Sequence, residues 1–190
     1  MKTINRISLY MLMMLAFTLA CMRKEIPVQE KEDEKEEVNV VKWKQNGVWY
    51  QSEDAPISFM PHAWGVSYRI YEDSSMWFEG RDWPDYKDIT IRIQDSLFKE
   101  GLIEMGQGHY DFDFVPGSYA MYSQQENYWW VDYYTRPGSG WVEIEWMSED
   151  KRKFKGRFEM TLYNYQGRSV TLTDGYFNID MDKLDEEHKH

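Results

Sequence analysis

Apolar and polar residues alternate with a period of two along much of the chain after Val38. The clearest stretches are 89–93 and 154–162, in which every second position is apolar or glycine. A period of two places successive side chains on opposite faces of a strand, so one face of each stretch is predicted to be buried. No long stretch after Val38 keeps the 3.6-residue period of a helix. The pattern therefore predicts an all-β domain.

Shorter alternating or aromatic segments indicate the remaining strands. Asn46-Gly47 lies between segments that carry Trp43 and Trp49, which is a strong hairpin signal. Further strands are predicted at 64–71, 76–79, 106–114, 119–122, 127–135, 141–146, 170–172 and 176–179. A loop is predicted over 80–88, a helical turn or long loop over 95–101, and turns at 116–117, 136–140, 148–153, 164–168 and 174–175. This spacing favours an antiparallel β-sandwich, with a lipocalin-like β-barrel as the alternative.

The longest apolar run of the chain lies near the N-terminus. Lys2 and Arg6 precede the run from Ile7 to Ala20, which is shorter than the roughly 20 apolar residues that cross a bilayer. This pattern is typical of a signal peptide over residues 1–20. Ala20-Cys21 resembles the end of the bacterial lipoprotein signal, whose cysteine is acylated, so Cys21 is predicted to carry lipid. Ordinary secretory cleavage before Cys21 is the alternative.

Residues 21–37 form a predicted tether between the lipidated cysteine and the domain. Residues 22–37 contain seven acidic and four basic residues with few apolar ones, so they cannot bury a core. Fully extended, these 16 residues span roughly 55 Å. The simpler interpretation of this segment is a solvated linker. An acidic tract soon after the cysteine also resembles that of surface-exposed lipoproteins in Bacteroidetes.

Composition limits the remaining possibilities. Removing residues 1–20, which carry two positive charges and no negative ones, changes the net charge from −11 to about −13, so nucleic acid is not an expected partner. Cys21 is the only cysteine, which leaves no internal disulfide and no thiolate metal cage. Trp, Tyr and Phe make up 17% of the chain, and such residues favour pleated surfaces and bury large areas. The expected organisation is a single β domain over 38–182 followed by a charged tail over 183–190.

The segment from Gly140 to Ile179 resembles a group of small β-rich Bacteroidetes lipoproteins of unknown function. The resemblance is carried by Val142-Glu143-Ile144, by Lys155-Gly156-Arg157-Phe158-Glu159, by Asn164, and by the run from Val170 to Phe177. It covers about a fifth of the chain. It implies a β fold and an envelope location, and no reaction.

Two pairs of carboxylates share a strand face in this pattern. Glu143 and Glu145 are two residues apart, which puts their backbone positions roughly 6.7 Å apart, near the spacing of a glycosidase pair. Glycosidases set their two carboxylates across a cleft, whereas this face is predicted to be solvated, so no catalytic residue is assigned. Asp111 and Asp113, with His109, could ligate a cation, but calcium needs six to eight oxygen ligands. Alternation of polar residues on a strand explains this second pair, and no metal is expected.

Other catalytic chemistry finds little support in the sequence. No Gly-x-Ser-x-Gly motif or glycine-rich phosphate loop is present. His62 and His109 have no identifiable serine partner, and His188 and His190 lie in the predicted tail. No cofactor is expected, and an enzyme is the minority interpretation.

The aromatic run 128–134 is the sharpest functional feature. Trp129, Val131 and Tyr133 share one strand face, while Tyr128, Trp130, Asp132 and Tyr134 share the other. One set is predicted to fill the core. The second, joined by Trp141, could form an exposed platform for a sugar ring or a protein, which makes Trp130, Tyr134 and Trp141 the candidate ligand-binding residues. The simpler interpretation is that both faces are packed.

These features lead to one functional expectation and two alternatives. The expectation is a lipid-anchored outer-membrane protein that binds a glycan or an envelope protein without catalysis. Exposure at the periplasmic side and exposure at the cell surface are both left open. One alternative is a carbohydrate-active hydrolase that uses Glu143 or Glu145. The other is a structural component of the envelope.

Overall fold

The computed structural model describes residues 37–52, 65–71, 74–108 and 117–187, and it confirms the all-β prediction. Its strands are β1 Val40–Gln45, β2 Val48–Gln51, β3 Val66–Ile70, β4 Met76–Asp82, β5 Lys87–Ile93, β6 Gly101–Glu104, β7 Tyr119–Glu126, β8 Trp129–Tyr134, β9 Gly140–Met147, β10 Lys153–Tyr163 and β11 Ser169–Asp180. A 3-10 turn at Asp95–Leu97 and the helix α2, Met181–Glu187, complete the described elements.

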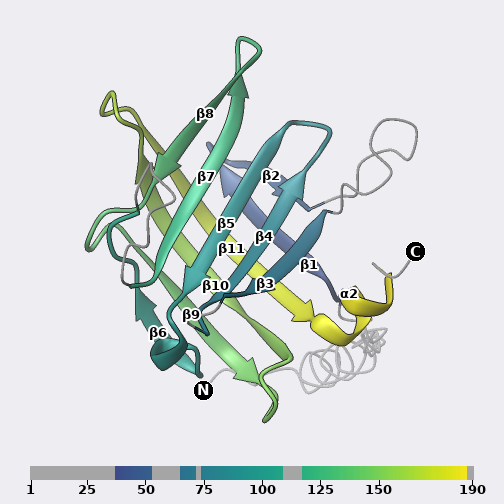
Figure 1. Ribbon diagram of the computed structural model, residues 1–190. Helices are drawn as coiled ribbons and strands as arrows, with labels where there is room; N and C mark the ends of the chain where they lie inside the picture. The colour runs from purple at the N-terminus through teal and green to yellow at the C-terminus, as the bar shows by residue number, and fades with distance from the viewer. Residues whose placement is uncertain (1–36, 53–64, 72–73, 109–116, 188–190) are drawn as a thin grey trace, which may run out of the picture. The chain divides into compact units, whose positions relative to one another are not determined.

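The strands form one antiparallel sheet that folds over itself into two layers (Figure 1). Its hydrogen-bonded order is β2-β1-β11-β10-β8-β7-β5-β4-β3, with β9 also paired to β10 and β6 paired to β9. The layers are joined where Tyr134 of β8 pairs with Tyr163 of β10. The two ends of the path, β2 and β3, do not pair with each other, so the sheet is not closed. The sandwich is therefore confirmed and the closed barrel is not formed.

The core lies between the two layers and follows the predicted alternation. Phe78 of β4 contacts Phe177 of β11 with ring centroids 4.9 Å apart, and Phe154 of β10 at 5.6 Å. All three rings are at most 1% exposed. Burying one such side chain contributes about 1.5–3 kcal/mol, so this cross-layer contact is a principal source of stability.

A glycine sets how closely the layers approach at the neighbouring position. Gly80 of β4 faces Val41 of β1, and a Cβ atom on Gly80 would lie 2.4 Å from the Cβ of Val41. No larger residue fits there without separating the strands. The prediction of a loop over 80–88 is wrong for this reason: β4 continues through Gly80 to Asp82, and β5 begins at Lys87.

Three other local predictions also differ from the structure. β6 was not expected, because its four residues carry only two apolar side chains. Asn127 and Tyr128 do not extend β8 but form the β7–β8 turn, with φ of 50° and 71°. Residues 106–108 are not a strand, and the rest of the strand predicted there, residues 109–114, lies outside the described residues.

Bulges account for two more differences. β11 runs through the turn predicted at Asp174-Gly175, and the irregular pairing there is absorbed by a φ of 51° at Asp174. On β9 the register against β10 shifts between Ile144 and Trp146. Trp146 is consequently 46% exposed, although strict alternation from Ile144 would put both side chains on the buried face.

The segment 183–187, expected to belong to a charged tail, is the end of the helix α2. Met181 and Leu184 of α2 are buried in the core. Arg152 donates to Asp182 at 2.5 Å and to Asp185 at 2.6 Å. Two apolar residues three apart on a short helix give a weak sequence signal, which explains why the acidic residues around them dominated the prediction.

The chain enters and leaves the domain at one end and turns at the other. The carbonyl oxygen of Glu37 accepts a hydrogen bond from Asn178, near the end of β11, at 2.8 Å. The β10–β11 turn lies at the opposite end, beside the β7–β8 turn, because Arg168 pairs with Glu126 at 2.7 Å. No helix among the described residues has the length and apolar character required to cross a bilayer.

Candidate functional site

The three aromatic residues proposed from the sequence all lie on outward sides of the sheet but do not form one patch. Tyr134 pairs with Tyr163, whereas Trp141 of β9 pairs with Glu159, four residues earlier on β10. Four strand residues correspond to about 13 Å. Trp130 is likewise four residues from Tyr134 along β8, and it is 48% exposed.

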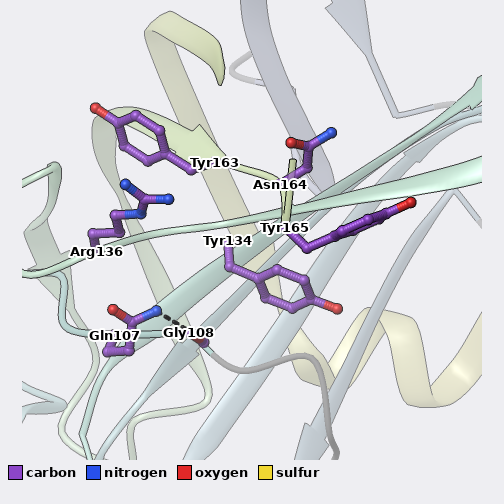
Figure 2. A pocket seen from close by; sticks show the side chains of 7 residues that line it. All are labelled: Gln107, Gly108, Tyr134, Arg136, Tyr163, Asn164 and Tyr165. Carbon is purple, nitrogen blue, oxygen red and sulfur yellow. Dashed lines mark hydrogen bonds between the residues drawn. The ribbon is translucent and has the colours of Figure 1, made fainter. Parts of the chain in front are cut away.

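Tyr134 instead belongs to a pocket at the junction of β8 and β10 (Figure 2). The pocket has a volume of about 210 Å³ and is open to solvent. Three tyrosines supply most of its aromatic surface, and the remaining lining residues are polar or glycine. The lining consists of Gln107, Gly108, Tyr134, Arg136, Tyr163, Asn164 and Tyr165.

Asn164 shapes the side of the pocket that follows β10. Its Oδ1 accepts hydrogen bonds from the backbone N–H groups of Gln166 at 3.0 Å and Arg168 at 2.8 Å. This Asn-centred turn projects Tyr165 outward, where it is 77% exposed. Gly167, with a φ of 79°, completes the turn in a conformation that favours glycine.

Gly108 holds Tyr134 in place from the other side. Its backbone N–H donates to the carbonyl of Thr135 at 2.9 Å. A Cβ atom on Gly108 would lie 3.0 Å from the Cβ of Tyr134, so a side chain there would displace the tyrosine. The close approach of these two residues defines one wall of the pocket.

Arg136 and Gln107 are the polar side chains that can meet a ligand. The guanidinium of Arg136 lies over the Tyr163 ring, 4.2 Å from its centroid, while its backbone N–H donates to Ser139. Gln107 donates to the carbonyl of Gly108 at 2.7 Å. Its amide oxygen remains a potential acceptor for a hydroxyl group.

The described lining of the pocket combines aromatic faces with polar groups. None of its seven residues is Asp, Glu, Ser, Cys, Lys or His. Such a lining can stack on a ring and hydrogen-bond to its substituents.

The carboxylate pair considered from the sequence lies elsewhere. Glu145 is paired with Arg157 of β10 at 2.8 Å, and Arg157 also lies opposite Glu143. Arg157 is six residues from Tyr163 along β10, which corresponds to about 20 Å. The pair is therefore on the exposed face of β9 and β10, away from the pocket.

A partly exposed polar network lies near the β7–β8 and β10–β11 turns. Glu126 accepts hydrogen bonds from Tyr133, Gln124 and Arg168, each at 2.7 Å. The hydrogen bond from Tyr133 is the main reason that the pKa of the Glu126 carboxyl is lowered. Because these donors are all satisfied within the fold, we assign the network a structural role.

A second buried polar cluster lies on the outer side of β4 and β5. Arg81 pairs with Glu79, and its Nε lies 3.0 Å from the Oδ2 of Asp88. The N–H of that Nε is not aligned for a hydrogen bond, and the Oδ1 of Asp88 accepts none. Burial raises the pKa of Asp88 to about 6, against the opposing effect of Arg81.

Metal and histidine predictions are not addressed by the described residues. His62, His109, Asp111, Asp113, His188 and His190 all lie outside them. Within the described part of the chain, no group of three or more His, Cys, Asp or Glu side chains could hold a metal ion. Trp141 and Trp130 remain sequence-based candidates that the pocket does not include.

Sequence reasoning identified Tyr134 and missed Arg136, Tyr163 and Tyr165. The signal that could have found Tyr165 is its place in the turn Asn164-Tyr165-Gln166-Gly167, where an aromatic side chain is forced outward. The pairing of β8 with β10 brings the other two residues to Tyr134, and the sequence contains no signal for that pairing.

The structure defines the class of this protein. It is an open, two-layered antiparallel β protein with a tyrosine-lined pocket at the seam between the layers. Comparison with models of known protein families, with characterised proteins and with solved structures finds no match.

Proposed function

We propose that the protein is a non-enzymatic glycan-binding domain, held at the outer membrane by lipid on Cys21 and accessible to ligands at the cell surface. The single observation that carries the binding half is the convergence of Tyr134, Tyr163 and Tyr165 on one open pocket. Sugars present apolar ring faces edged by hydroxyl groups, so tyrosines flanked by an amide and a guanidinium complement them.

The size of the pocket favours a small part of a ligand. Pockets for drug-sized molecules usually measure about 300–1,000 Å³, whereas this one measures about 210 Å³. We therefore propose that one sugar ring of a longer glycan enters the pocket while neighbouring rings remain in solvent.

The position of the pocket supports binding of a ligand that lies away from the membrane. The chain enters the domain near Asn178, which pairs with Lys155 at the far end of β10 from Tyr163. The eight residues between Lys155 and Tyr163 correspond to about 26 Å. A domain tethered through its N-terminal end can thus direct the pocket away from the membrane.

The hydrolase and the purely structural role are less well supported. Glu145 is paired with Arg157, and neither Glu143 nor Glu145 is among the residues that line the tyrosine pocket. No observation specifically favours a structural role over ligand binding.

The proposal is tested by binding of the mature chain, in detergent micelles, to an array of bacterial and host glycans. Tyr165→Ala is the first variant, because this residue is 77% exposed and its removal leaves the core intact. We expect Tyr165→Ala to weaken glycan binding about tenfold. We expect the same of Tyr134→Ala, since each substitution removes one aromatic contact.

Trp146→Ala serves as the matched control, because Trp146 is an exposed aromatic on β9 that does not line the pocket. It should bind as the parent does. Trp130→Ala and Trp141→Ala should have smaller effects than Tyr165→Ala. The proposed function is refuted if the parent protein binds no glycan. It is also refuted if the parent and both tyrosine variants bind equally well.

A further inference from the structure

The charge of the pocket is opposite to that of the chain. Arg136 is the only charged residue among the seven that line it, and none of the seven is acidic. The chain as a whole carries a net charge of −11. A single cation among the described lining residues of a pocket, in an acidic protein, points to the charge of the ligand.

Four other arginines of the domain differ from Arg136 in their partners, whereas Arg69, like Arg136, contacts a tyrosine ring. Arg81, Arg152, Arg157 and Arg168 each form an ion pair with at least one carboxylate. Among the described residues, no carboxylate lies within ion-pair distance of Arg136, whose guanidinium contacts the Tyr163 ring instead. The side chain is exposed, so its charge is available to a ligand.

The contact with Tyr163 also holds this charge at the pocket, because a guanidinium 4.2 Å from a ring centroid is attracted to the face of the ring. The N–H groups of a guanidinium lie in one plane. Those N–H groups match the two oxygens of a carboxylate, and such bidentate pairs are stronger than neutral hydrogen bonds. Arg136, Tyr134 and Tyr165 line the same pocket and are labelled in Figure 2.

We infer that the pocket selects an acidic sugar of the uronic acid class, whose carboxylate pairs with Arg136 while its ring contacts the tyrosines. This inference rests on the proposed glycan-binding function and adds the class of sugar. The negative charge of the rest of the chain does not prevent such pairing, since exposed charges farther than about 8 Å apart are largely screened at physiological salt.

The test uses matched ligands that differ only in charge. Affinities of the mature chain in micelles are measured by calorimetry for a panel of oligouronates and for the same oligosaccharides with their carboxylates methyl-esterified. We expect the acidic form of at least one pair to bind about tenfold or more tightly. This ratio is the readout, because a general loss of folding would weaken both members of a pair.

Variants then test whether Arg136 produces this preference. Arg136→Gln should bring the ratio of the two affinities, acidic form to esterified form, close to one while preserving weak binding of the esterified form. Arg136→Lys should retain part of it, because lysine keeps the charge without the bidentate geometry. Arg157→Gln removes the same charge about 20 Å away along β10 and should leave the ratio unchanged.

The possible results separate this inference from the function on which it rests. Glycans that bind at the tyrosines with no preference for the acidic form would overturn the inference and leave the proposed function intact. A preference that survives Arg136→Gln would overturn it as well. Absence of binding to every member of this panel and of the broader glycan array would overturn both.

Discussion

At the scale of single residues, Asp88 is the carboxyl whose environment changes its ionisation most clearly. Its side chain is 14% exposed and shares Arg81 with Glu79. Burial penalises the charged form, which raises the pKa to about 6 from an ordinary value of 3.8. The folded state therefore holds this proton more tightly than the unfolded state does, and the contribution of Asp88 to stability falls as the pH rises from about 4 through about 6.

The free energy of unfolding of Asp88→Asn should therefore increase, relative to that of the parent protein, as the pH rises. A shift of about two pKa units corresponds to about 3 kcal/mol, which sets the largest gain expected between pH 4 and pH 7. Urea unfolding of both proteins across this range measures the difference. A difference that does not vary with pH would show that Asp88 titrates normally.

Asp150 provides a control with the opposite sign. Its pKa is lowered, chiefly by the hydrogen bond from the Ser148 hydroxyl at 2.6 Å, and also by the backbone N–H of Arg152. Its contribution to stability is present above the ordinary pKa and is lost as the pH falls. Asp150→Asn should therefore become less favourable, relative to the parent, as the pH rises through the acid range.

At the scale of elements, the β7–β8 hairpin contains a residue type that its turn does not favour. Asn127 and Tyr128 both have positive φ, as the central residues of a type I′ turn require, and glycine is the preferred second residue. A tyrosine in this conformation costs about 1 kcal/mol relative to glycine. Its side chain is 93% exposed and recovers little of that cost by packing.

Tyr128→Gly should therefore stabilise the domain by about 0.5–1 kcal/mol, and the midpoint of thermal unfolding should rise by a few degrees. Gln166→Gly is the matched control, because Gln166 lies in the exposed β10–β11 turn without a positive φ. That variant should be neutral or destabilising. A fall in the melting temperature of Tyr128→Gly would contradict the account of this turn.

The same hairpin shows where sequence reasoning about elements succeeds and fails. Alternation correctly placed Tyr133 in the core, but it put Trp129 on the same face, and Trp129 is 77% exposed against 48% for Trp130. The prediction for Trp129 is therefore wrong next to the β7–β8 turn, where Trp129 pairs with Glu126. The predicted start of this strand at residue 127 was wrong. Aromatic residues favour strands, so the turn at Tyr128 was not recognised from the sequence. On β9, a bulge changed the direction of Trp146, and no local pattern announces such an insertion.

At the scale of the whole molecule, residues 37–190 form a compact unit distinct from the first 36 residues. The described core residues that hold the two layers together belong to this unit, including the buried residues of α2. The unit should fold without the preceding segment. The described residues that line the pocket also belong to it.

A chain that begins at Glu37 should thus have the same free energy of unfolding, within about 0.5 kcal/mol, as the chain that begins at Cys21. Its affinity for any glycan that the longer chain binds should also be unchanged. Urea unfolding and calorimetry of the two chains provide the comparison. A marked loss of stability in the shorter chain would mean that residues 21–36 contribute to the fold.

The sequence by itself determined the all-β class, most strand positions and one pocket residue, Tyr134. These follow from local rules, because alternation and turn chemistry act over a few neighbouring residues. It also predicts the lipid anchor at Cys21, a processing signal that is read from an extended chain. Tertiary structure alone decided that the sheet stays open and that Tyr134 meets Tyr163, Tyr165 and Arg136. The reason is physical: pairing between β8 and β10 depends on how the two layers bury their common core, and that free energy belongs to the folded domain rather than to either strand.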